Sequence, residues 1–241
     1  MPPANTLRVC AAQPSLASDL ASAVIDHARI VRNVDADLVV FPELSLTGYV
    51  LDAHPVDLNG PDVLADLVDA CTSTGAVALV GAPVREEGRD HIATLRIDPA
   101  GVTIAYRKRH LGADEEPRFR PGPGPGLIDV HGWRVGLGIC KDTGVEQHVA
   151  AMAALDLDLY ACGVVHHRTE IDEQMRRATH IARRCRSYVV MASHAGPTGH
   201  GYGDTAGNSV VVDPTGTCVI RAGDAPGTTV TASLGSRSDA P

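Results

Sequence analysis

The chain has 241 residues, a length that suits one large α/β domain. Hydrophobic residues make up 44% and charged residues 21%, a composition typical of globular proteins and not of disordered ones. The net charge of −8, the lack of a long basic run and an aromatic content of 3% argue against nucleic acid or an anionic membrane surface as a partner.

The N-terminal segment shows no apolar stretch of a secretory signal, and no segment reaches the roughly 18 apolar residues of a membrane-spanning helix. The 6 cysteines form no CxxC pair and fit no zinc or haem spacing. We therefore expect reduced thiols, a cytoplasmic protein, and no metal or cofactor.

Short apolar strands alternate with helical stretches along the chain. Hydrophobic spacing predicts strands over Leu7–Gln13, Asp37–Phe41, Ala76–Val84, His91–Ile97, Gly101–Tyr106, Arg134–Ile139, Leu157–Cys162, Tyr188–Ser193, Asn208–Val212 and Cys218–Arg221. Helical spacing covers Ser18–Val31, Asp62–Thr74, Val145–Leu155 and Glu170–Arg186. The segment Ala76–Val84 is apolar almost throughout, as in a strand buried on both faces.

A D-P-x-G turn occurs twice, at Asp98–Gly101 and Asp213–Gly216, each time between two predicted strands. The order of elements before each turn is similar, which indicates one domain with two related halves. We expect this domain to span residues 1–234 and residues 235–241 to form a flexible tail. Two long loops rich in glycine, over residues 112–126 and 195–207, are candidates for function.

Three polar side chains each follow an apolar strand, a position from which a rigid sheet presents catalytic groups to a crevice. Glu43 could act as a general base, Lys108 could stabilise an oxyanion, and Cys140 could be a nucleophile favoured as thiolate by backbone N–H groups. Taken singly, each also fits a structural interpretation: a solvated carboxylate, a basic surface run and a buried apolar cysteine.

Taken together, the segments around these residues resemble one family. F-P-E-L-x-L-T-G-Y over residues 41–49, Y-x-K-x-H-L over residues 106–111 and G-x-x-I-C-x-D over residues 136–142 follow the pattern of the nitrilase superfamily, the carbon–nitrogen hydrolases. The resemblance runs from about Leu7 to about Ala232. It implies a four-layer α-β-β-α sandwich with an internal pseudo-two-fold axis.

The resemblance also implies a catalytic triad of Glu43, Lys108 and Cys140. A second glutamate of the family corresponds to Glu115, which precedes an aromatic residue by four positions, and Glu116 is the alternative. The backbone N–H of Lys141 would complete an oxyanion hole.

Substrate-binding candidates are Tyr49, at the end of the first motif, and His166, His167 and Arg168, which follow a strand where the family often has small residues and an aromatic. Arg168 could pair with a substrate carboxylate. Adjacent histidines in a strand point to opposite faces, so a metal site there is not expected. Two further departures are Lys141 in place of an aromatic, and Ala182–Cys185 in place of A-x-E-N; both weaken assignment to a substrate branch.

These features predict a cofactor-free hydrolase that cleaves an amide of a small polar molecule through a thioester on Cys140. Hydrolysis of a nitrile or an N-carbamoyl compound, and acyl transfer, would use the same triad and are alternative functions. A further alternative is that the protein is a non-catalytic member of the family. A Cys–His hydrolase would instead need His110 or His194 as its base. The family resemblance further predicts a homodimer or larger assembly formed through Val145–Leu155 and Glu170–Arg186.

Overall fold

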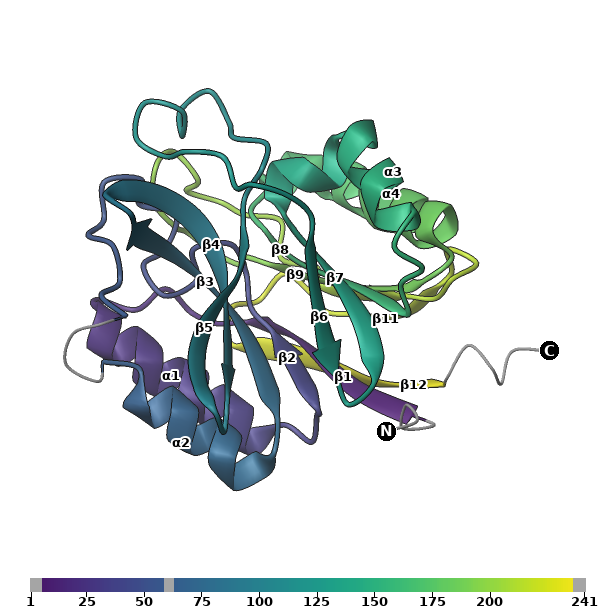
Figure 1. Cartoon of the computed structure of the whole chain (residues 1–241), viewed down its shortest axis with the longest axis horizontal. Helices are drawn as coiled ribbons and strands as arrows, with labels where there is room; N and C mark the ends of the chain where they lie inside the picture. The colour runs from purple at the N-terminus through teal and green to yellow at the C-terminus, as the bar shows by residue number, and fades with distance from the viewer. Residues whose placement is uncertain (1–5, 59–62, 236–241) are drawn as a thin grey trace.

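Two six-stranded sheets face each other at the centre of the structure, a computed structural model that describes residues 6–58 and 63–235 (Figure 1). In spatial order the first sheet contains β12 (Thr228–Gly235), β1 (Thr6–Gln13), β2 (Leu38–Val40), β3 (Val77–Glu86), β4 (Arg89–Asp98) and β5 (Gly101–Arg107). The second contains β11 (Cys218–Arg221), β10 (Val210–Val212), β9 (Tyr188–Ser193), β8 (Leu159–Val164), β7 (Trp133–Ile139) and β6 (Gly126–Val130).

Two helices cover the outer face of each sheet (Figure 1). The first sheet carries α1 (Leu20–Asn33) and α2 (Ala65–Thr74); the second carries α3 (Glu146–Ala153) and α4 (Ile171–Cys185), which follow the short 3-10 helices η1 (Cys140–Gly144) and η2 (Arg168–Glu170). The layers are therefore α-β-β-α, which confirms the predicted sandwich.

The two sheets have the same topology. In the first, β1, β2 and β3 are parallel and β4 and β5 return antiparallel; in the second, β7, β8 and β9 are parallel and β10 and β11 return antiparallel. One further antiparallel strand flanks each parallel set, β12 beside β1 and β6 beside β7. The pseudo-two-fold relation predicted from the two D-P-x-G turns is therefore present in the strand order.

Two strands were not predicted. β6 lies at the end of a segment interpreted as loop, and β12 lies in a segment given no element, although its threonines and valine favour a strand. Gly235, placed in the expected tail, pairs with Thr6 at the end of β12. The rest of that tail, and the predicted start of the second helix at Asp62, fall outside the described residues.

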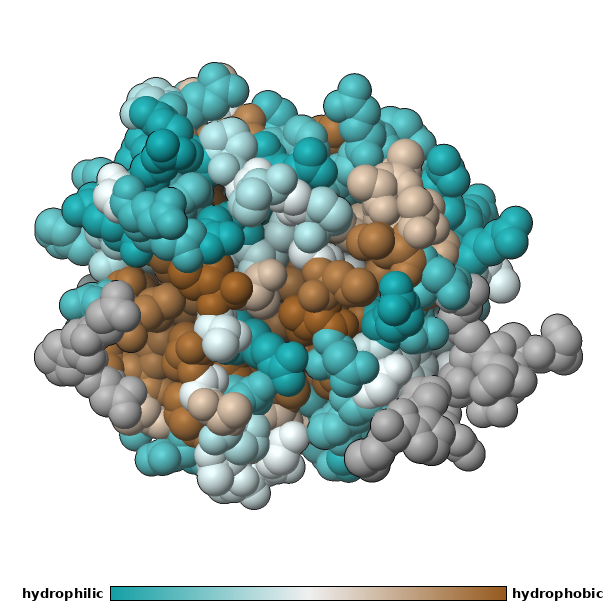
Figure 2. All heavy atoms as spheres, in the orientation of Figure 1, coloured by the Kyte–Doolittle hydropathy of each residue, from teal (hydrophilic) through white to brown (hydrophobic). Residues whose placement is uncertain are grey.

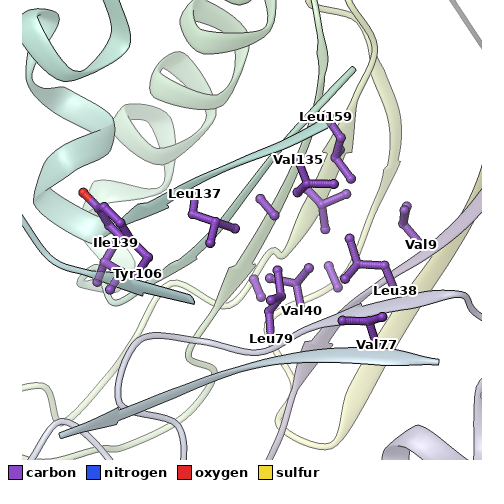
Figure 3. Close-up of a cluster of buried hydrophobic side chains, with 14 of the residues drawn as sticks. Val9, Leu38, Val40, Val77, Leu79, Tyr106, Val135, Leu137, Ile139 and Leu159 are labelled. Carbon is purple, nitrogen blue, oxygen red and sulfur yellow. The ribbon is translucent and has the colours of Figure 1, made fainter. Parts of the chain in front are cut away.

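Three apolar layers hold the sandwich together. The central layer lies between the sheets, where side chains of β1, β2 and β3 face those of β7 and β8 (Figure 3). Leu38, Leu79 and Leu159 are almost completely buried there. The two outer layers pack α1 and α2 on the first sheet and α3 and α4 on the second. Burial of each such leucine or valine contributes roughly 1.5–3 kcal/mol.

The two helices predicted to form a dimer interface, α3 and α4, direct some of their apolar side chains into the core of the protein. Val149 and Met152 of α3 are buried against the second sheet, so these two residues do not identify a dimer surface. Partly exposed apolar side chains lie on α3 and α4 themselves, at Ala153 and Met175, and also on β5 and β6, on the face shown in Figure 2. Assembly stays a prediction.

None of the helices in the described ranges is long and apolar enough to cross a membrane. All six cysteines lie in described segments as free thiols.

Candidate active site

Three strand ends bring their polar side chains together at one end of the sandwich. Glu43 follows β2, Lys108 follows β5, and Cys140 follows β7. The Lys108 Nζ lies 2.6 Å from Glu43 Oε1 and 2.6 Å from Glu115 Oε1, and all three side chains are almost completely buried. Cys140 is half-buried. The structure thus assembles residues that are up to 97 positions apart, from Glu43 to Cys140.

The backbone of Glu43 is held from three sides. Gly81 in β3 and Gly163 in β8 approach it so closely that a Cβ would lie 2.3 Å from Leu44 N and 2.6 Å from Glu43 N, respectively, so only glycine fits at either position. His194 donates a hydrogen bond of 2.6 Å through Nε2 to the Glu43 carbonyl oxygen. Both sheets therefore fix the carboxylate in place.

The electrostatic setting of Glu43 suits a general base. Burial raises the pKa of Glu43 to about 7, and the charge of Glu115 acts in the same direction, against the lowering effect of Lys108. The second oxygen, Oε2, is buried and has no hydrogen-bond partner among the described residues. A carboxylate with a free oxygen and a pKa near neutrality can take up and return a proton.

Lys108 retains its charge although it is buried. Burial alone would lower the pKa of Lys108, but the charges of Glu43, Cys140 and Glu115 raise it above the ordinary value. An ammonium group has three N–H donors. Glu43 and Glu115 accept two of them, which leaves one for an oxygen atom of a substrate.

Glu115, and not Glu116, is the second glutamate of the site. Its Oε1 accepts hydrogen bonds from Lys108 and from the Tyr49 hydroxyl at 2.7 Å, and its Oε2 accepts one from Gly112 N at 2.7 Å. Glu116 is exposed. Glu115 therefore orients both Lys108 and Tyr49, the latter a predicted substrate-binding residue.

Cys140 lies at a sharp turn between β7 and η1. Its φ of 39° is in the left-handed region, which is uncommon for a residue with a Cβ and is frequent at functional sites. The thiol donates a hydrogen bond of 3.2 Å to the Val165 carbonyl oxygen. Burial, together with the Glu43 charge, raises the pKa of Cys140 above its ordinary value. Burial therefore acts against the effect of the backbone N–H groups, which favour thiolate.

Asp142 fixes this turn to the segment that carries Lys108. Its carboxylate accepts four hydrogen bonds, from the Ile139 N–H, the Tyr106 hydroxyl, and both the backbone N–H and Nδ1 of His110. His110, Asp142 and His148 place potential ligand atoms within 4.8 Å of one another. Since the Asp142 oxygens are already occupied, we interpret this cluster as structural.

The predicted substrate-binding residues after β8 are placed differently from one another. His166 is buried, with Nδ1 3.1 Å from Gln174 Oε1, and burial lowers its pKa to about 4. His167 is exposed and stacks on the Tyr202 ring, with centroids 4.3 Å apart.

Arg168 already has two carboxylate partners. Its guanidinium forms ion pairs with Asp204 at 2.8 Å and Asp224 at 2.5 Å. It ties the segment after β8 to the 195–207 loop and to the segment before β12. Because its guanidinium is engaged within the protein, we leave Arg168 out of the proposed site.

Tyr202 is a candidate that the sequence did not reveal. Its ring packs edge-on against Tyr49, with centroids 5.0 Å apart. Burial raises the pKa of Tyr202 to about 12, and the nearby charges of Cys140 and Glu43 add to this shift. The only available signal was its place in the second glycine-rich loop, and we now place Tyr202 in the wall beside Cys140.

The two histidines considered as bases for a Cys–His hydrolase are engaged elsewhere. His110 Nδ1 lies 2.8 Å from Asp142, and His194 donates to the Glu43 backbone. The carboxylate of Glu43 is therefore the better candidate for the base.

Comparison with known proteins agrees with this geometry. The carbon–nitrogen hydrolase family matches residues 6–238. An (R)-stereoselective amidase from a Pseudomonas species is 29% identical over 194 residues, which are 78% of this chain and 70% of the amidase. An omega-amidase from Escherichia coli is 24% identical over 188 residues, 77% of this chain and 72% of that enzyme.

Solved structures share the fold. A CN-hydrolase superfamily protein from Xanthomonas campestris has a TM-score of 0.86 at 21% identity, covering 96% of this chain and 91% of its own. An amidase of the nitrilase superfamily from Nesterenkonia has a TM-score of 0.79 at 21% identity, covering 98% and 93%. The resemblance seen in the sequence is thereby confirmed, and the chain belongs to the carbon–nitrogen hydrolase family, whose members act on C–N bonds other than peptide bonds.

Proposed function

We propose that this protein hydrolyses an amide of a small polar molecule through a thioester on Cys140, with Glu43, Lys108 and Cys140 as its catalytic triad. The observation that carries the proposal is the buried Lys108 ammonium between two carboxylates, beside a half-buried thiol at a strained turn. Such an arrangement supplies a base, an electrophilic charge and a nucleophile without further groups.

In the first half-reaction the Cys140 sulfur attacks the amide carbon while Glu43 Oε2 takes the thiol proton. This coupling is needed because the thiol is protonated at rest. The third N–H of Lys108 and the backbone N–H of Lys141 hold the developing oxyanion, each such donor contributing about 3 kcal/mol to the lowering of the barrier. Glu43 then returns its proton to the leaving nitrogen, and ammonia or an amine departs.

In the second half-reaction water attacks the thioester carbon. Glu43 takes a proton from the water, the C–S bond breaks, and the proton returns to the Cys140 sulfur as the carboxylic acid leaves. The sum is one amide and one water converted to one acid and one ammonia or amine. Glu115 keeps Lys108 and Tyr49 in position throughout.

Amides are favoured over other substrates because the curated relatives include two kinds of amidase. Nitrile and N-carbamoyl hydrolysis would begin with the same attack and are the alternatives. The test is ammonia release from matched sets of short aliphatic amides, nitriles and N-carbamoyl compounds, with the Cys140→Ala protein as control. We expect amides to be turned over fastest. Release confined to nitriles or N-carbamoyl compounds would contradict the amide assignment.

A further inference from the structure

A cavity of about 470 Å³ lies outside the cluster of Glu43, Glu115 and Cys140. It is open to solvent and is bordered by the segment that links β5 to β6, which forms the loop at the top of Figure 1, and by η1 and the residue that precedes α3. This volume is in the range of sites that bind small organic molecules.

The charged side chains around this cavity are mostly cationic and unpaired. Arg109, Arg120 and Lys141 line it, and none of them forms an ion pair within the described part of the chain. By contrast, Arg107 at the end of β5 is paired with Glu86, and Arg118 of the linking segment is paired with Asp90. In a protein with a net charge of −8, three unpaired cations around one cavity are available for an anion from solution.

Apart from Glu116 and His110, whose Nδ1 lies 2.8 Å from Asp142 Oδ1, the rest of the lining is apolar. Leu111 and Phe119 are buried, and Pro121 and Val145 complete this part of the wall. Glu116 is the only carboxylate among the lining residues. An apolar floor with a cationic rim suits a ligand that joins an anionic group to an apolar body.

The cavity and the catalytic cluster share one wall. Each of three catalytic residues is followed directly in the chain by a residue that lines the cavity: Lys108 by Arg109, Glu115 by Glu116, and Cys140 by Lys141. Lys141 Nζ also donates to the Leu111 carbonyl oxygen, which bridges the two sides of the cavity. A ligand that displaces these backbone segments would therefore move the catalytic groups.

We propose that this cavity is a second binding site, specific for a small organic anion with a carboxylate or phosphate on an apolar body, and that its occupation alters the reactivity of Cys140. Arg109 is the principal anion contact, because its guanidinium makes no hydrogen bond within the described residues and is free to bind. Arg120 and Lys141 contribute charge at the rim.

Binding is tested by calorimetry with benzoate and phenyl phosphate as probes and benzyl alcohol as the neutral analogue. Cys218→Ala protein, which lacks the exposed thiol, is first alkylated at Cys140 with iodoacetamide, and peptide mass spectrometry checks the modification, so that the result does not depend on the proposed function. We expect one anion per chain, bound at least about tenfold more tightly than the alcohol and less tightly at higher salt. A preference for either anion identifies which of the two headgroups the site favours.

The decisive variant is Arg109→Ala, which removes no internal hydrogen bond and should keep the unfolding temperature. It should weaken anion binding at least about tenfold, whereas Arg176→Ala on the exposed face of α4 should have no effect. In unmodified protein, benzoate should change the alkylation rate of Cys140 at least about twofold, and Arg109→Ala should abolish this change. Equal affinity for benzoate and benzyl alcohol, unchanged affinity in Arg109→Ala, or an alkylation rate indifferent to benzoate would overturn the proposal.

Discussion

The ends of β2 and β8 are equivalent positions in the two halves of the molecule, yet they carry different chemistry. After β2, Glu43 is buried against a lysine, and its pKa is raised to about 7. After β8, His166 is buried beside Gln174 and the positive charge of Arg177, and its pKa is lowered to about 4. The Glu43 carboxyl can therefore exchange a proton near neutral pH, whereas the His166 imidazole stays uncharged there.

The two pKa values differ because different side chains contact Glu43 and His166. The segment after β5 places Lys108 against Glu43, so an ionised carboxylate is stabilised there. In the second half, His166 is buried against the neutral Gln174 side chain and the Arg177 guanidinium, so its imidazole stays neutral. The two halves therefore repeat one strand end, and burial together with the charge of the neighbouring group decides whether the side chain there can exchange a proton near neutral pH.

Loss of the nucleophile should have the largest effect. Cys140→Ala should lower kcat by roughly 10⁴-fold or more while the fold survives, because covalent chemistry stops and only a small side chain is lost. Steady-state ammonia release measures this effect. Cys218→Ala, at an exposed cysteine, is the control and should match the parent protein. Comparable losses in both variants would contradict the assignment.

The comparison of the two strand ends can be tested directly by paired substitutions. Glu43→Gln keeps the shape of the side chain but removes the base, and should lower kcat/KM by about 10²–10⁴-fold. His166→Asn, at the equivalent strand end, should change kcat/KM less than about fivefold, because its neutral ring contacts Gln174 and Arg177, and neither is a proposed catalytic group. If His166→Asn costs as much as Glu43→Gln, the two ends do not differ as described.

The pH dependence should report Glu43. Its pKa is raised to about 7, so below this pH the carboxyl is protonated and cannot accept the thiol proton. We expect kcat/KM to fall about tenfold per pH unit below 7 and to level off above it. The profile is measured with an amide that has no titratable group in this range. A profile flat down to pH 5 would show that no group with this pKa controls the reaction.

Asp142 should contribute to the stability of the fold through the hydrogen bonds that its carboxylate accepts. Asp142→Asn introduces a donor where four donors already converge, so at least one buried hydrogen bond is lost. The expected loss in the free energy of unfolding is roughly 1–3 kcal/mol, measured by urea denaturation. Asp69→Asn, on the exposed side of α2, is the control. Equal stability of the two variants would mean that Asp142 does not fix the turn.

Arg168 should give the smallest effect. Since Asp204 and Asp224 hold its guanidinium, Arg168→Ala should leave KM the same for a carboxylate-bearing amide and for its neutral analogue. A selective rise in KM for the charged amide would restore the original prediction that Arg168 binds substrate.

The fold and the grouping of Glu43, Lys108 and Cys140 could be predicted because their signals are local. Strand spacing, the two D-P-x-G turns and the motifs around Glu43, Lys108 and Cys140 each lie within a few residues, and Glu115 followed from its spacing to Phe119. The edge strands β6 and β12 are set by pairing with β7 and β1, which local spacing reveals less well.

Long-range contacts account for the rest. Gly163 and His194 hold the Glu43 backbone from the opposite sheet, across more than 100 positions of sequence, so no local pattern marks them. Tyr202 reaches Tyr49 from a loop. The raised pKa of Cys140 depends on burial, which outweighed the local effect expected from the turn. The partners of Arg168 likewise come from distant loops.

The central claim, an acyl group carried by Cys140, is tested most directly by rapid quenching in acid during amide turnover, followed by intact-protein and peptide mass spectrometry. The account predicts an adduct of the acyl mass on the peptide that contains Cys140, lost on treatment with hydroxylamine and absent from Cys140→Ala. An acyl adduct on another residue, or full turnover by Cys140→Ala, would contradict the account.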